Sequence, residues 1–436
     1  MEVAMTRVSE LSLLTGWLPV VLPLLGVLGW VWLLFPRAQR YRKAAMPVAL
    51  LAAAVLTVAL YLFVEEIWQL YPDPIGLSVY MLIAIGVAAV LLIVPRILVR
   101  RTVWTGVVTA LAAVAVLVAV GTGINLRYPS YPTVGAALGI DHVKRLHADQ
   151  LPLREQVISG RPLESVWSAP SGLPKGGEVM TAAVPPTASG IAAREAQIYL
   201  PPAYFADPRP LLPVLVLLAG EPGTPQDWFA DGRLTETLDE FARAHRGLAP
   251  VVVVADGTGG QPANPLCLDS RLGDVATYLA VDVPAWTRAN LQIDPDPRAW
   301  AVGGLSYGGT CALQLATNYP QVYPTFLDMS GPDEPTLGDR QRTVDAAFGG
   351  DTAAPPSANP LDLPLGQTHQ DSAGAFVVGA DDEQYRPQVE RMFHAAKAAG
   401  MDVRLQIVPG GHDFAVWSIG LRVQLPWLAT RLGIAP

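Results

Sequence analysis

The sequence predicts two parts, namely an all-α transmembrane region of about four helices followed by an α/β domain. In the α/β domain a mostly parallel central sheet carries helices on both faces. Long apolar runs fill the first third of the chain, and short apolar runs alternate with helical segments after residue 176. The mean hydropathy of +0.32, with 51% hydrophobic and 16% charged residues, is too apolar for an ordinary soluble enzyme.

The transmembrane prediction depends on four apolar runs, at about 11–35, 48–64, 75–94 and 103–120. Each run is near the 17–25 residues or so that cross a hydrocarbon core. The first run has no basic stretch before it and no small-residue cleavage site after it, and three further runs follow. We therefore expect an anchor and not a cleaved signal peptide.

Charged residues between these runs predict the orientation. Basic residues lie between the first and second runs and between the third and fourth: Arg37, Arg40, Arg42, Lys43, Arg96, Arg100 and Arg101. The remaining loop carries Glu65, Glu66 and Asp73. The positive-inside rule puts both basic loops in the cytoplasm, so the chain after the fourth run lies outside. The sequence predicts a multi-pass protein of the cell membrane whose α/β domain is extracytoplasmic.

We divide the chain into a transmembrane anchor (1–124), an extracytoplasmic connector (125–175) and the α/β domain (176–436), whose motifs predict a catalytic role. The connector is rich in proline and glycine, as in a tether, with a short amphipathic helix expected at 138–150. The net charge is −8, and basic residues cluster only beside the apolar runs. This charge distribution argues against a nucleic-acid partner.

A Gly-x-Ser-x-Gly motif, Gly304–Gly308, carries the candidate nucleophile Ser306. An apolar stretch of strand length, 299–303, precedes it, and a helical stretch, 309–316, follows. A serine on a sharp turn between strand and helix is the nucleophile elbow of the α/β-hydrolase fold. In that fold the amide after the nucleophile, here that of Tyr307, helps to hold the oxyanion.

The candidate base is His412, which follows a predicted strand at 403–408. A serine hydroxyl is a weak nucleophile at neutral pH and needs a base to take its proton. The α/β-hydrolase order along the chain is serine, acid, histidine, and His412 is the histidine that suits the last position.

The candidate acid comes directly after a predicted strand at 375–379, where Asp381, Asp382 and Glu383 are adjacent. The carboxylate of such a triad fixes the imidazole tautomer and stabilises the imidazolium. Because the strand ends in a glycine and the acid then comes a few residues on, we favour Asp382. Asp381 is the alternative.

The second oxyanion donor is expected after the apolar run 212–218. The residues that follow are Ala219, Gly220, Glu221 and Pro222. Proline has no N–H, which leaves the Glu221 amide as the expected donor.

The two cysteines, Cys267 and Cys311, both fall in the predicted extracytoplasmic domain, where disulfides persist. The loop that carries Cys267 should pass beside the elbow helix that carries Cys311. We expect a disulfide, with two buried thiols as the alternative. Neither cysteine has a second ligand at metal spacing, so no metal site is predicted.

Residues 176–436 resemble the esterase-D-type branch of the α/β-hydrolases, which includes the mycolyltransferases. The matching segments are Ile198–Tyr204, Ala219–Gly220, Gly304–Gly309 and Gly410–Trp417. The resemblance implies a serine esterase or acyltransferase without a cofactor. The mycolyltransferases carry a glutamate as the acid, and the strand end at Ala219–Gly220 usually reads Asp-Gly or His-Gly. Both differences favour an esterase.

The predicted function is hydrolysis of an ester at the outer membrane surface through Ser306, His412 and Asp382. A lipid, an acylated glycan or an aminoacyl-lipid would each suit an enzyme tethered to the bilayer. One alternative is an acyltransferase of the mycolyltransferase type, which moves the acyl group to an alcohol. The other is a catalytically silent module that binds at the membrane surface.

Overall fold

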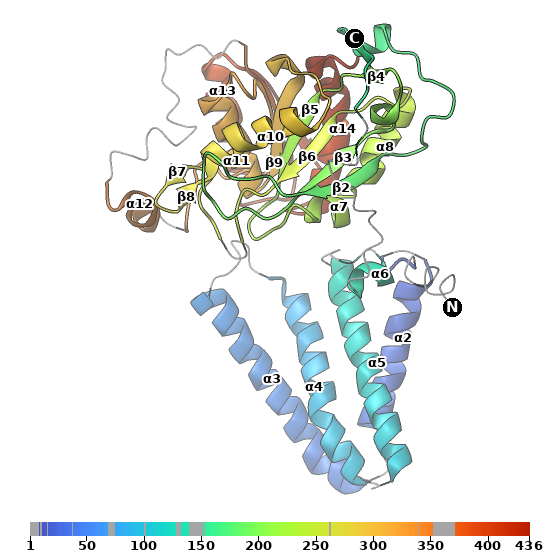
Figure 1. Ribbon diagram of the computed structural model, residues 1–436. Helices are drawn as coiled ribbons and strands as arrows, with labels where there is room; N and C mark the ends of the chain where they lie inside the picture. The colour runs from blue at the N-terminus through green and yellow to red at the C-terminus, as the bar shows by residue number, and fades with distance from the viewer. Residues whose placement is uncertain are drawn as a thin grey trace. The chain divides into compact units, whose positions relative to one another are not determined.

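The structure is a computed structural model (Figure 1). It describes residues 8, 11–14, 16–36, 38–68, 75–99, 102–127, 131, 133–138, 151, 153–260, 263–338, 340–351 and 371–436. The chain forms two compact units, Met1–His142 and Val143–Pro436, and each is described by itself. The loop positions Arg37, Asp73, Arg100 and Arg101 and most of the expected helix at 138–150 lie outside the described residues.

The apolar runs form the helices of the first unit. In chain order these are α2 (Leu18–Leu34), η1 (Tyr41–Ala45), α3 (Met46–Leu62), η2 (Phe63–Trp68), α4 (Leu77–Val99), α5 (Val103–Arg127) and α6 (Val134–Ala137). Among the described residues, three helical segments are long and apolar enough to cross a membrane: Tyr41–Ile67, Leu77–Val99 and Val103–Arg127. The helix α2 is equally apolar but has 17 residues.

Small residues let α2 pack closely and antiparallel against α5. A Cβ on Gly29 would lie 2.5 Å from the Ala112 carbonyl oxygen, and one on Gly26 would overlap Ala119. The Trp32 indole also donates a 3.2 Å hydrogen bond to Thr109. Close backbone approach at glycine and alanine is typical of helices that associate in membranes.

Arg96 lies in a different place from the one we expected. It belongs to the last turn of α4 instead of the loop that follows, and it is only 7% exposed. Its guanidinium donates to the Trp32 carbonyl oxygen at 3.0 Å and stacks on the Trp32 ring. These contacts provide the buried guanidinium with a hydrogen-bond acceptor and an aromatic face.

The second unit is built on an eight-stranded sheet in the order β12-β11-β10-β9-β5-β6-β3-β2. The strands are β2 (Glu178–Ala182), β3 (Ala196–Leu200), β5 (Val214–Leu218), β6 (Val251–Ala255), β9 (Trp300–Leu305), β10 (Thr325–Met329), β11 (Ala373–Gly379) and β12 (Asp402–Val408). All neighbours pair in parallel except β2–β3 and β3–β6. The central strands are apolar and fully buried, as expected for parallel strands covered on both faces.

Helices cover both faces of this sheet (Figure 1). The helices of this unit longer than seven residues are α8 (Leu234–Ala244), α10 (Val283–Asn290), α11 (Tyr307–Asn318), α12 (Arg340–Phe348), α13 (Arg386–Ala398) and α14 (Phe414–Leu432), of which α12 lies beside β7 and β8 and away from the sheet (Figure 1). Shorter elements are β1 (Val157–Ile158), η4 (Leu163–Ser165), η5 (Pro202–Phe205), β4 (Arg209–Pro210), α7 (Asp227–Ala230), β7 (Asp269–Ser270), β8 (Gly273–Asp274), α9 (Val275–Thr277), η6 (Tyr278–Asp282) and η7 (Pro297–Ala299). The predicted fold class is confirmed.

Part of the expected connector packs with the second unit. Its β1 pairs with β4, and Leu163 and Trp167 are buried in the core of that unit. The division into anchor, connector and catalytic domain stays a prediction.

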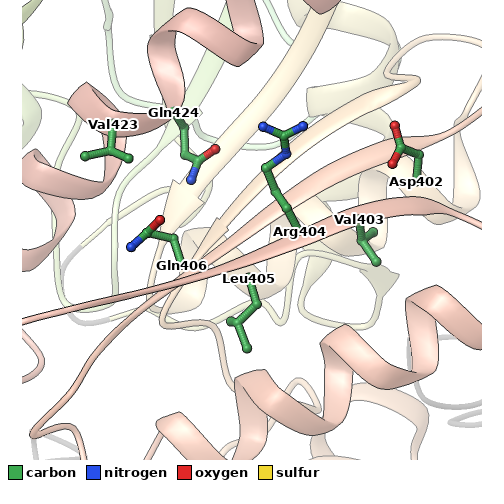
Figure 2. Close-up of a pocket in the computed structure, with 7 residues that line it drawn as sticks. All are labelled: Asp402, Val403, Arg404, Leu405, Gln406, Val423 and Gln424. Atoms are coloured by element: carbon green, nitrogen blue, oxygen red, sulfur yellow. The ribbon is translucent and has the colours of Figure 1, made fainter.

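The outer edge of the sheet carries a groove between β12 and α14 (Figure 2). The groove is lined by Asp402, Val403, Arg404, Leu405, Gln406, Val423 and Gln424. None of these residues is among the predicted site residues, so the groove has no part in the site below.

Candidate active site

Ser306 occupies the turn between β9 and α11 in a strained conformation. Its φ of 53° and ψ of −121° lie where a residue with a side chain rarely sits. The neighbouring strand holds this turn in place, because the Ser306 amide donates to the Met329 carbonyl oxygen at 2.8 Å. Such strain is typical of a nucleophile elbow, which exposes the hydroxyl above the sheet.

The glycine at position 308 is required by close packing beneath the elbow. A Cβ on Gly308 would lie 2.5 Å from the Leu218 carbonyl oxygen and 2.6 Å from that of Ala219. The first turn of α11 therefore rests on the end of β5, and the serine lies beside the loop that leaves that strand.

His412 is hydrogen-bonded to both Ser306 and Asp382. Its Nε2 is 3.0 Å from the serine hydroxyl oxygen, and its Nδ1 is 3.0 Å from Oδ2 of the aspartate. The acid and histidine loops leave the adjacent parallel strands β11 and β12. The Asp381 amide joins these loops by donating to the Gly410 carbonyl oxygen at 2.9 Å.

The two aspartates differ sharply in their surroundings. Asp382 is 4% exposed, and its Oδ1 accepts from the Tyr385 amide at 3.0 Å. Asp381 is exposed, as is Glu383. Of the three candidate acids, the structure brings Asp382 to the histidine.

Two aromatic rings hold the imidazole of His412, and we assigned neither a role from the sequence. Tyr385 stacks on the imidazole with centroids 4.3 Å apart, and Trp417 meets it edge-on at 5.0 Å. Tyr385 is three residues after Asp382, and Trp417 lies in the first turns of α14. Their role depends on tertiary packing, which the local sequence pattern does not contain.

The loop after β5 passes close to Ser306. A Cβ on Gly220 would lie 3.5 Å from the Ser306 Cβ. Among the described residues, the Glu221 amide donates to no backbone acceptor. The Tyr307 amide is at the first position of α11, where a helix leaves its amides without an intrahelical acceptor. Burial raises the pKa of the Glu221 carboxyl group.

The predicted disulfide between Cys267 and Cys311 is present, with Cα atoms 5.4 Å apart. It ties the loop after β6 to α11, one turn beyond the elbow. Among the described residues, no group of three or more His, Cys, Asp or Glu is placed to hold a metal ion.

We expect Cys267→Ser to lower the free energy of unfolding by about 2–4 kcal/mol, because the bridge joins residues 44 apart. Thermal unfolding of the full-length protein in detergent measures the effect. Reductant should lower the melting temperature of the wild type towards that of the variant and leave the variant unchanged. Free thiols in the native protein by mass spectrometry would contradict the bridge.

A buried carboxyl group lies behind the elbow. Asp328 in β10 is 0% exposed, and its Oδ1 accepts from the Gly331 amide at 2.9 Å. Within the described residues its Oδ2 has no hydrogen-bond partner. Burial raises the pKa of Asp328 to about 7, although the Gly331 hydrogen bond opposes the shift.

This pKa predicts a pH-dependent stability. Between about pH 4 and pH 7 the native state keeps the Asp328 proton while the unfolded chain loses it, so stability falls as the pH rises. Above pH 7 the loss of unfolding free energy is on the order of 4 kcal/mol, since one pKa unit corresponds to about 1.4 kcal/mol. We expect Asp328→Asn to gain melting temperature relative to the wild type from pH 4 to pH 8. The exposed control Asp381→Asn should show no such trend, and a parallel pH dependence in all three proteins would contradict the assignment.

The sheet topology, the strained serine and the hydrogen-bonded histidine and aspartate are those of an α/β-hydrolase. Residues 192–428 match the model of the putative esterase family. An uncharacterised protein of Corynebacterium glutamicum is 37% identical over 395 residues, which cover 88% of this chain and 89% of the relative. The chain belongs to the putative esterase family, and it is an enzyme that acts on esters by hydrolysis or acyl transfer.

Further similarities agree with this assignment. A segment of 62 residues is 42% identical to the diacylglycerol acyltransferase/mycolyltransferase Ag85C of Mycobacterium leprae, over 14% of this chain and 18% of that protein. A ferulic acid esterase superposes with a TM-score of 0.51 at 18% identity, over 60% of this chain and 100% of the other. An S-formylglutathione hydrolase of Agrobacterium tumefaciens superposes with a TM-score of 0.50 at 20% identity, over 61% and 99%. The two structures share the fold.

Proposed function

We propose that this protein is a membrane-anchored serine esterase whose catalytic domain faces out of the cytoplasm. The observation that supports this most strongly is the continuous hydrogen-bonded line from Ser306 through His412 to Asp382, with 3.0 Å at each step. A catalytically silent binding module has no need of this arrangement.

The chemistry runs in two steps. The Ser306 hydroxyl oxygen attacks the ester carbonyl carbon while His412 Nε2 takes its proton, and Asp382 stabilises the imidazolium. The carbon–oxygen bond to the alcohol then breaks, and Nε2 returns the proton to the leaving alcohol. Water repeats the attack on the acyl-enzyme and releases the carboxylic acid and the free serine. The amides of Tyr307 and Glu221 hold the negative oxygen in both steps.

The substrate is an ester that reaches the enzyme at or near the membrane surface. A lipid, an acylated glycan or an aminoacyl-lipid would each present such a bond. The anchor supports this choice, because it keeps the enzyme beside the bilayer.

Product analysis tests hydrolysis against transfer. Full-length protein in detergent is given p-nitrophenyl butyrate with increasing 1-hexanol. We expect butyric acid as the main product at low hexanol concentration. With Ser306→Ala, butyric acid should form no faster than it does without enzyme. Hexyl butyrate as the main product at low alcohol would favour the acyltransferase. The sequence match to the mycolyltransferase is the observation that supports this alternative.

The proposed orientation counts α2 as a fourth span. Its 17 residues reach about 26 Å at 1.5 Å per residue, and it lies antiparallel to α5. Four spans put both ends of the anchor on the same side of the membrane. The basic residues Arg40, Arg42 and Lys43 follow the first span, and the positive-inside rule puts them in the cytoplasm, so both ends of the anchor lie outside.

We expect a cysteine at Ala183 to react with an impermeant maleimide in intact cells and one at Gln39 to react only after lysis. Both positions are exposed, and the native cysteines are paired. The first position lies in the catalytic unit, and the second lies between the first two helices. Labelling of position 39 alone in intact cells would invert the orientation.

A further inference from the structure

Arg194 occupies an unusual position beside the proposed oxyanion loop, residues 219–224. It precedes β3, and its side chain is 28% exposed. Its Nη2 donates to the Gly223 carbonyl oxygen at 2.9 Å and to the Thr258 hydroxyl at 2.6 Å. One guanidinium therefore joins the loop after β5 to the loop after β6.

The carboxylate of Asp256, which directly follows β6 and is 1% exposed, binds this guanidinium. Its two oxygens accept from Arg194 Nη2 at 2.8 Å and Nε at 3.0 Å, and Oδ2 also accepts from the Arg194 amide at 2.7 Å. The amides of Thr258 and Gly259 donate to the same carboxylate at 3.1 Å each. Burial alone would raise the pKa of Asp256, but these hydrogen bonds hold it below the ordinary value.

The loop after β6, residues 256–259, also contacts the residue that follows Ser306. The Tyr307 hydroxyl donates to the Gly257 carbonyl oxygen at 2.8 Å. The strands β5 and β6 are parallel neighbours, with Leu218 opposite Ala255, so their loops leave the sheet side by side. The two proposed oxyanion donors, the amides of Tyr307 and Glu221, thus belong to segments that are both fastened to residues 256–259.

We propose that Arg194 is a positioning residue that fixes the oxyanion loop, and with it the Glu221 amide, relative to Ser306. The inference rests on the proposed function. An oxyanion donor has to lie about 2.7–3.1 Å from the developing negative oxygen, and a displacement of about 1 Å can lower the rate about 100-fold. The bond to the Gly223 carbonyl, two residues from the donor amide, provides that precision.

Lysine can replace the charge of Arg194 but not its planar fork. Arg194→Lys keeps a cation beside the buried Asp256 and loses the simultaneous bonds to Asp256 and Gly223. Arg298→Ala is the matched control, because Arg298 also forms a bidentate pair with an aspartate, Asp296, but is 74% exposed.

The experiment uses full-length protein in detergent and first measures the rate of labelling by a fluorophosphonate. It then measures KM for p-nitrophenyl butyrate, and kcat normalised to the number of serines that the fluorophosphonate can label. We expect Arg194→Ala and Arg194→Lys to lower the labelling rate and kcat by about 10- to 100-fold, with KM within about threefold of the wild type. Arg298→Ala should match the wild type. If Arg194→Ala does not fold, Arg194→Lys carries the same test.

The outcomes separate this inference from the function on which it rests. Wild-type kcat per labelled serine in Arg194→Lys, or a change in KM alone, would overturn the positioning role while leaving the esterase intact. A loss of melting temperature without a loss of kcat would do the same. If the wild type shows no labelling that depends on Ser306, the proposed nucleophile is wrong and the positioning role is wrong with it.

Discussion

Replacing Ser306 by alanine is expected to lower kcat for an ester substrate by about 10⁵- to 10⁶-fold. In the proposed mechanism the Ser306 hydroxyl oxygen forms the acyl-enzyme, and the substitution removes this oxygen together with its 3.0 Å hydrogen bond to His412. Ser306 is 8% exposed and small, so the substitution should leave the melting temperature nearly unchanged. Steady-state kinetics of the two purified full-length proteins measure the effect.

Ser330 provides a matched control for this substitution. It follows the neighbouring strand β10 and also has a positive φ, of 57°. Its hydroxyl accepts a 3.2 Å hydrogen bond from the Trp417 indole and has no hydrogen bond to His412 among the described residues. We expect Ser330→Ala to keep kcat within about tenfold of the wild type. Similar losses in both variants would show that the effect comes from disturbed folding of the strand ends.

The second large effect is expected from the acid. Asp382→Asn should lower kcat by about 10³- to 10⁴-fold, because an amide at this position leaves the wrong imidazole tautomer facing Ser306. KM should change little, since the Asp382 side chain is 4% exposed and bonds to the opposite side of the His412 ring from Ser306.

The neighbouring aspartate separates this prediction from a general charge effect. Asp381→Asn removes the same charge one residue away, from an exposed side chain, and should keep kcat within about threefold. A larger loss in Asp381→Asn than in Asp382→Asn would assign the acid to Asp381.

The elements around the site could be predicted from the sequence because local patterns determine them. The apolar runs at 299–303, 375–379 and 403–408 appear as β9, β11 and β12, and each site residue follows the end of its strand. Parallel strands place these ends at one edge of the sheet, so their order along the chain was enough to bring together Ser306, His412 and the loop that carries Asp381 and Asp382.

Other parts of the site depend on contacts between segments that are distant in the sequence. The choice between Asp381 and Asp382 depends on which side chain turns inward from the loop after β11. His412 is held by Tyr385 from the loop after β11 and by Trp417 from α14, and Arg194 joins the loops after β5 and β6. An isolated arginine before a strand carries no local signal of such a role. The prediction that Arg96 lies in a loop was wrong for a similar reason. Arg96 lies in α4, where Trp32 from another helix contacts its guanidinium.

The central claim, that Ser306 is the nucleophile, is tested most directly by locating a covalent adduct. The full-length protein is treated with a fluorophosphonate, digested and analysed by mass spectrometry. We predict a single phosphonyl group on the peptide that contains Ser306, and its absence from His412→Ala under the same brief exposure. An adduct on another serine, or an unmodified Ser306 in active protein, would contradict the account.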